Sequence, residues 1–180
     1  MSERSQKRRV YRKHQIHALT LRQARTIDAI AARIFPTTDT PGALEAGAVF
    51  YIDQALAGPY PELRPFYASA LRAVDRHAKS RFSVPFLSLT ESQQDAVLMD
   101  FEAGTVEAYA RAADFFETIR AHILEGVFGE PNYGGNKDLI GWRLVGFPGQ
   151  QYGYADAYIN RVVDLKPVAC EGVPLKRNQS

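Results

Sequence analysis

Apolar residues recur every three or four positions in five stretches of the chain, and this spacing predicts a mainly helical protein. The first predicted helix begins after Thr20, whose hydroxyl group is a suitable N-cap, and Pro36 stops it. Its apolar face comprises Leu21, Ile27, Ile30 and Ile34. A turn-rich connection over residues 37–42 then separates this helix from the rest of the chain.

Four further helices are predicted, over residues 44–56, residues 63–79, residues from Thr90 onward and residues 106–125. Thr90 and Gln93 have the spacing of a capping box. The expected core positions are Val49, Ile52, Leu56, Phe66, Ala70, Leu71, Val74, Ala78, Val97, Leu98, Phe101, Tyr109, Ala113, Phe116, Ile119 and Ile123. The fold class is therefore all-α, a small bundle of about five helices with a long irregular C-terminal extension.

The periodic pattern is lost after Gly126, where most of the chain's 13 glycines and its single tryptophan, Trp142, are found. We expect residues 127–149 to be ordered by packing and not by regular helix, because Trp142 and Phe147 offer large apolar areas. The chain is thus divided into residues 1–18, a flexible basic arm, residues 19–149, the helical domain, and residues 150–180, an irregular tail that wraps a partner.

Charge is concentrated in the basic arm, which holds six of the 22 basic residues within its first 13 positions. The remainder of the chain carries a net charge of about −3, so its surface has no obvious nucleic-acid footprint. A polar stretch, and not an apolar one, follows Arg8 and Arg9, which argues against a twin-arginine export signal and favours a cytoplasmic location. No run of 18 apolar residues predicts a transmembrane helix.

Motifs for catalysis are missing from the sequence. It has no nucleophile elbow, no phosphate-binding loop, no G-x-G-x-x-G fingerprint and no Glu-x-x-His motif for a di-iron site. His14 and His17 fit a solvated pair better than a metal site, and His77 and His122 fit packed histidines. Asp114 and Glu117 are three residues apart and share a face of a predicted helix. Such a pair is more often exposed to solvent than part of a hydrolase active site, whose two carboxylates normally come from different elements. We therefore assign no catalytic, cofactor-binding or metal-ligating residue, and Cys170, the single cysteine, has no assigned role.

Two segments of the sequence contain motifs that a helical bundle does not need in general. The first is Ile34-Phe35-Pro36-Thr37-Thr38-Asp39-Thr40-Pro41-Gly42-Ala43, which leads to Gly47 and then to Tyr51-Ile52-Asp53. The second contains Tyr133-Gly134-Gly135-Asn136, followed by Gly141-Trp142 and Gly146-Phe147-Pro148-Gly149. In this order, over residues 19–149, the segments resemble the gluconate 2-dehydrogenase subunit 3 family.

The resemblance implies a non-catalytic small subunit that supports the folding, stability or export of a larger partner. That partner is a flavoprotein of the glucose–methanol–choline type, which carries FAD and oxidises CH–OH groups of sugars or glycosides. A cytochrome receives the electrons in some such complexes. Exported family members often carry a twin-arginine signal, and the lack of an apolar stretch after Arg8 and Arg9 instead favours a cytoplasmic complex.

We expect the glycine-rich region and the tail to contact this partner, because irregular segments on a rigid scaffold commonly carry binding residues. The candidate partner-binding residues are Asn132, Tyr133, Gly134, Gly135, Asn136, Trp142, Phe147, Tyr152 and Tyr154. Three alternatives stay open at this point: the loop covers the chain's own core, the chain is a stand-alone scaffolding or regulatory module, or it is an independent enzyme with a pocket of Tyr, His and Asp residues.

Overall fold

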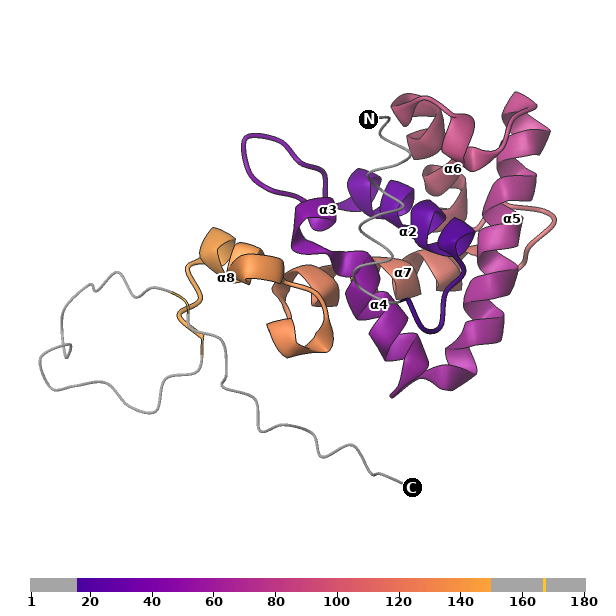
Figure 1. Ribbon diagram of the computed structural model, residues 1–180. Helices are drawn as coiled ribbons and strands as arrows, with labels where there is room; N and C mark the ends of the chain where they lie inside the picture. Colours follow the sequence, from indigo (N-terminus) through magenta and orange to yellow (C-terminus); the bar gives the residue numbers. More distant parts are fainter. Residues whose placement is uncertain (1–15, 150–166, 168–180) are drawn as a thin grey trace, which may run out of the picture.

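The computed structural model describes residues 16–149 and Pro167, and every regular element within them is a helix, as the sequence predicts (Figure 1). The α-helices are α2 (Leu21–Ile34), α3 (Ala43–Ala46), α4 (Ala48–Ala57), α5 (Arg64–Phe82), α6 (Glu91–Glu102), α7 (Ala112–Phe128) and α8 (Ile140–Val145). Four 3₁₀ turns connect them: η1 (Pro61–Leu63), η2 (Phe86–Ser88), η3 (Pro131–Tyr133) and η4 (Lys137–Leu139). Within the same residues, no helix is long and apolar enough to cross a membrane.

Helix α7 is the centre of the bundle, because it contacts all six of the other α-helices. Its fully buried side chains include Phe115, Ile119 and Ile123, and Phe115 meets the rings of three aromatic residues from α5 and α6 edge-on. Figure 1 shows α5 and α6 on one side of the bundle and α8 on the other. The core positions predicted on α4, α5 and α6 are buried.

Two of the predicted helix starts are confirmed in atomic detail. The Thr20 hydroxyl accepts the N–H of Gln23 at 3.2 Å, and the Gln23 side chain accepts the N–H of Thr20 at 2.7 Å. Thr90 and Gln93 form the same reciprocal pair at the start of α6. These contacts satisfy N–H groups that would otherwise lack partners at each helix N-terminus. The placement of Leu21 on the buried face was wrong, since 42% of its surface is exposed.

The continuous helix predicted for residues 44–56 is wrong, because the chain breaks at Gly47. This residue has a φ of 71°, in the left-handed region that favours glycine, and it ends α3 while it precedes α4. The break changes the direction of the chain and brings Ala43 and Ala46 of α3 into the core beside α7. A periodic apolar pattern continues across such a break and does not reveal it.

The helix predicted for residues 106–125 begins later and ends later. Residues 106–111 form turns from which Val106 still reaches the core, so their apolar spacing imitates a helix. At the other end, α7 continues through Gly126 to Phe128. A Cβ at Gly126 would lie 2.9 Å from the Cα of Ala48, so this glycine serves close packing between α7 and α4 and does not end the helix.

Asp53 fastens the chain that precedes α2 onto α4. Its carboxylate accepts the backbone N–H groups of His17, Ala18 and Leu19 at 2.8, 2.9 and 2.9 Å, and only 2% of its surface is exposed. The first two of these residues belong to the predicted basic arm, whose residues 1–15 lie outside the described residues. The arm is therefore anchored where it joins the bundle.

We expect Asp53→Ala to lower the free energy of unfolding by about 2–3 kcal/mol, because a buried donor that loses its acceptor costs about 1–3 kcal/mol and exposure of the freed segment offsets part of the total. Asp53→Asn should cost less, since the amide keeps one acceptor oxygen. Urea unfolding of the two variants measures both effects. Unchanged stability in Asp53→Ala would show that the anchor contributes nothing to folding.

Candidate functional site

Residues 129–149, called the C-terminal segment below, are fastened to the end of α7 by Asn136. The Asn136 N–H donates to the Gly126 carbonyl at 2.6 Å, and its side-chain amide donates to the Gly129 carbonyl at 2.8 Å. Its side-chain oxygen accepts the N–H of Gly141 at 2.8 Å. Because Asn136 is fully buried, these three bonds form a lock between α7, the loop and α8.

Two glycines let the C-terminal segment lie directly on the backbone of α7. A Cβ at Gly135 would lie 2.1 Å from the carbonyl oxygen of Gly126, and a Cβ at Gly141 would lie 2.0 Å from that of Val127. Gly134, next to the first of these, has a φ of 98° and faces Gln54 of α4. The glycine pattern of this segment is therefore explained by close contact within the chain.

Trp142 closes the same lock from α8. Only 5% of its surface is exposed, and its indole N–H donates to the Phe128 carbonyl at 2.7 Å. The Phe147 ring packs edge-on against the indole with ring centres 4.9 Å apart. The prediction that residues 127–149 contain no regular helix is wrong for Ile140–Val145, because these contacts hold α8 in place.

Four exposed apolar side chains belong to α3 and to the C-terminal segment, and we call this set the apolar face: Leu44, Tyr133, Val145 and Phe147. Their exposed fractions are 40%, 60%, 61% and 45%. They come from elements that contact one another, since α3 touches both η4 and α8, and η3 touches η4. The other exposed large hydrophobic side chains among residues 16–149 are Leu21 of α2, Met99 of α6, and Tyr60 and Val84 in two separate connections. Exposed apolar side chains on adjoining elements are the raw material of an interaction surface.

The structure divides the predicted partner-binding residues into two groups. Gly135, Asn136 and Trp142 are turned into the chain, which agrees with the alternative that the loop covers its own core. Tyr133 and Phe147 are exposed, and the exposed Asn132 side chain donates to Glu130 at 3.3 Å. Tyr152 and Tyr154 lie outside the described residues. Leu44 and Val145 were missed, because nothing in the sequence distinguishes them from core residues.

A second constellation surrounds His122, and it is the strongest candidate for acid–base chemistry among residues 16–149. A hydrogen bond of 2.7 Å joins His122 Nδ1 to the Tyr67 hydroxyl group, and the Tyr60 and Tyr67 rings both stack on the imidazole at 5.9 Å. Nearby, the Tyr51 hydroxyl donates to Glu125 at 2.7 Å. The sequence predicted a packed histidine here, and His122 is buried.

The environment of this cluster favours the neutral form of the His122 imidazole. Burial lowers the pKa of His122, against a smaller opposing effect of the Glu125 charge. Burial also raises the pKa of Tyr67, and burial followed by the hydrogen bond to Glu125 raises that of Tyr51. A neutral imidazole hydrogen-bonded to a protonated phenol leaves both buried groups with a partner.

We expect stability to depend on pH through His122. Its pKa in the folded protein is lower than in the unfolded chain, so the unfolded state binds more protons as the pH falls below about 6.5. The associated stabilisation is complete above that pH and is lost as the pH decreases toward the folded pKa. Urea unfolding between about pH 7 and pH 5 should show this loss, and His122→Gln should remove it. An unchanged slope in the variant would contradict the assignment.

The other polar groups considered from the sequence have ordinary structural roles. His77 pairs with Asp100 at 2.6 Å, and Asp114 and Glu117 lie exposed on α7, where each pairs with an arginine three residues away. His17 contributes its backbone N–H to Asp53, while His14 and Cys170 are outside the described residues. Within residues 16–149 and Pro167, no three His, Cys, Asp or Glu side chains are arranged to hold a metal ion.

Residues 16–149 form an all-α body whose glycine-rich C-terminal segment is bonded to the end of α7. The family model described as gluconate 2-dehydrogenase subunit 3 matches residues 22–149, which run from α2 to the end of the C-terminal segment. The chain belongs to this family, as the resemblance of its motifs predicted. No curated protein and no solved structure matches it.

Proposed function

We propose that this chain is the non-catalytic small subunit of a sugar-oxidising complex, in which it binds and stabilises a larger FAD-dependent partner of the glucose–methanol–choline type. The observation that carries the proposal is the family match, which spans the whole described bundle together with the glycine-rich segment. The partner oxidises CH–OH groups of sugars or glycosides and passes the electrons to a cytochrome or another acceptor.

The division of labour follows from the chemistry that each chain provides. Hydride transfer to a flavin is the cofactor's chemistry, and proteins supply its binding site and orientation. Dinucleotides such as FAD are commonly held at the edge of a parallel sheet, whereas the described residues of this chain are arranged in helices. The flavin site therefore belongs to the partner in this proposal, and the small subunit contributes contact area.

The apolar face is the surface that we assign to the flavoprotein. Tyr133 and Phe147 supply exposed aromatic area, which dominates binding energy when a partner buries it. Asn136 and Trp142 hold those two residues in position from inside the chain, so they act on binding indirectly. Tyr152 and Tyr154 lie outside the described residues, and we propose that they also contact the flavoprotein.

Coexpression tests the stabilising role. We expect a flavin oxidoreductase encoded beside this chain to be soluble, flavin-loaded and active when both are produced together, and to lose most of its yield when the small subunit is omitted. The purified small subunit alone should show no flavin absorbance. A flavoprotein that is fully stable and active without this chain would contradict the proposal.

The location of the complex is a separate proposal. The polar residues that follow Arg8 and Arg9 favour the cytoplasm over export. Cell fractionation tests this, because a processed form of the chain outside the cytoplasm would overturn the location without touching the role as a subunit.

A further inference from the structure

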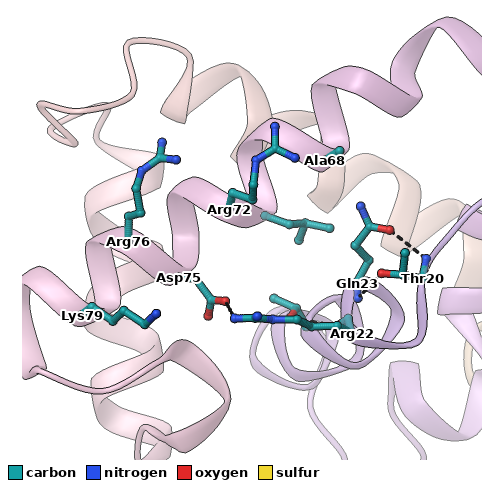
Figure 2. Close-up of a pocket in the computed structure, with 10 residues that line it drawn as sticks. Thr20, Arg22, Gln23, Ala68, Arg72, Asp75, Arg76 and Lys79 are labelled. Atoms are coloured by element: carbon teal, nitrogen blue, oxygen red, sulfur yellow. Dashed lines mark hydrogen bonds and ion pairs between the residues drawn. The ribbon is translucent and has the colours of Figure 1, made fainter.

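A basic groove lies between α2 and α5, on a side of the bundle away from the apolar face. Its volume is about 460 Å³, and Arg22 of α2 and Arg72, Arg76 and Lys79 of α5 line it (Figure 2). Figure 1 places α5 and α8 at opposite sides of the molecule. The groove is therefore a second surface, and its binding role is independent of the proposed flavoprotein.

Most of the positive charge in this groove has no partner among residues 16–149. Asp75 pairs with Arg22 and also accepts the N–H of Phe86 at 3.2 Å, so it fixes one guanidinium group across the groove. For Arg72, Arg76 and Lys79, the structure contains no ion pair or hydrogen bond of the side chain with residues 16–149. The groove thus presents a local charge of +3.

This excess of positive charge contrasts with the charge of the bundle as a whole. Residues 16–149 contain 12 basic and 16 acidic side chains, a net charge of −4. Like charges one helical turn apart destabilise a helix, and Arg72 and Arg76 have this spacing. Folding alone gives no reason for such a row, whereas a negatively charged ligand would.

We propose that this groove binds an acidic segment of a protein partner in extended conformation. Arg72 and Arg76 stand on the same side of α5 and are separated by about 6 Å along the helix axis, at about 1.5 Å per residue (Figure 2). Alternate side chains of an extended peptide lie on one face about 6.6 Å apart. Two carboxylates in an acidic-x-acidic pattern therefore match the two guanidinium groups, which bind carboxylates in bidentate fashion.

The surroundings favour a narrow peptide over other anions. The three cations are exposed, and Thr26, the buried polar side chain that lines the groove with them, donates its hydroxyl to the Arg22 carbonyl at 3.0 Å and not toward a ligand. A membrane or a nucleic acid is a broad anionic surface and would also meet the net negative charge that the rest of residues 16–149 carries. An extended segment can enter the groove, where the one acidic side chain, Asp75, is already paired with Arg22.

Fluorescence anisotropy with a labelled peptide of alternating aspartate and serine tests the proposal on the full chain. We expect the wild-type protein to bind the peptide and the double variant Arg72→Gln/Arg76→Gln to bind it at least about tenfold more weakly, with affinity that decreases as salt screens the charges. Arg120→Gln/Arg143→Gln removes two charges of the same kind from α7 and α8 and should bind as the wild type does. Circular dichroism verifies that both double variants are folded.

Four other outcomes would contradict the assignment of the groove to an acidic peptide. Absence of peptide binding would show that the groove does not bind acidic peptides. Equal loss of binding in both double variants would show that net charge or the basic arm determines binding and that the groove has no specific role. Displacement of the peptide by equimolar inorganic phosphate would make this a small-anion site. Sedimentation with phosphatidylglycerol vesicles that is lost only in Arg72→Gln/Arg76→Gln would assign the groove to a membrane.

Discussion

We expect Trp142→Ala to lower the free energy of unfolding by about 3–5 kcal/mol, the usual cost of removing a buried aromatic side chain. Only 5% of Trp142 is exposed, and the variant also loses the hydrogen bond from the indole to the Phe128 carbonyl. Because Phe147 packs on the indole, its ring should lose its fixed position as well. The effect therefore extends from the interior of the C-terminal segment to the apolar face.

Urea unfolding measures this loss, and hydrogen exchange locates it. Backbone amides of α8 should exchange faster in Trp142→Ala, while those of α5 and α6 keep their protection, because neither helix relies on Trp142. Trp142→Phe is the matched control, since it keeps much of the apolar volume but not the hydrogen bond, and it should cost less. A Trp142→Ala protein as stable as the wild type would show that the lock on α7 does not stabilise the fold.

The second large effect concerns binding and not stability. We expect Tyr133→Ala/Phe147→Ala to remain folded and to bind the flavoprotein at least about 100-fold more weakly, because buried aromatic residues at interfaces often contribute 2 kcal/mol or more each. Both side chains are roughly half exposed in this chain, so their loss removes little of its core. Surface plasmon resonance with the coexpressed partner measures the affinity.

Leu21→Ala/Met99→Ala supplies the control for that experiment. These two side chains are exposed to a similar degree, at 42% and 65%, but they lie on α2 and α6, away from the C-terminal segment. Their removal should leave the affinity unchanged. If both double variants bind equally well, the apolar face is not the interface, and the contacts with the partner lie elsewhere on the chain.

Local sequence signals were sufficient for most of the fold. The capping residues at Thr20 and Thr90 and the apolar stripe of α5 act within one or two turns, so they are legible without tertiary structure. The errors at Gly47 and Gly126 have a common cause. Whether a glycine ends a helix or permits two helices to touch depends on what packs against it, and Ala48 packs against Gly126 from a distant part of the sequence.

The sequence motif marked the C-terminal segment as the candidate site, but it did not distinguish the buried residues of this segment from the exposed ones. Asn136 and Trp142 look like surface-binding residues in sequence, yet both bond backbone carbonyls at the end of α7, Asn136 those of Gly126 and Gly129 and Trp142 that of Phe128. Asp53 was quoted only as part of a motif, and its role depends on N–H groups 34 to 36 residues earlier. Such long-range pairings are invisible to an analysis of local spacing.

The central claim, that this chain is one component of a flavoprotein complex, is tested most directly by isolating it from its own cells. An affinity-tagged copy at native abundance, passed through size exclusion with absorbance recorded at protein and flavin wavelengths, gives the answer in one profile. The account predicts one peak that contains this chain and a larger protein with bound FAD in fixed ratio. Elution of the chain by itself at about 20 kDa, without flavin, would contradict it.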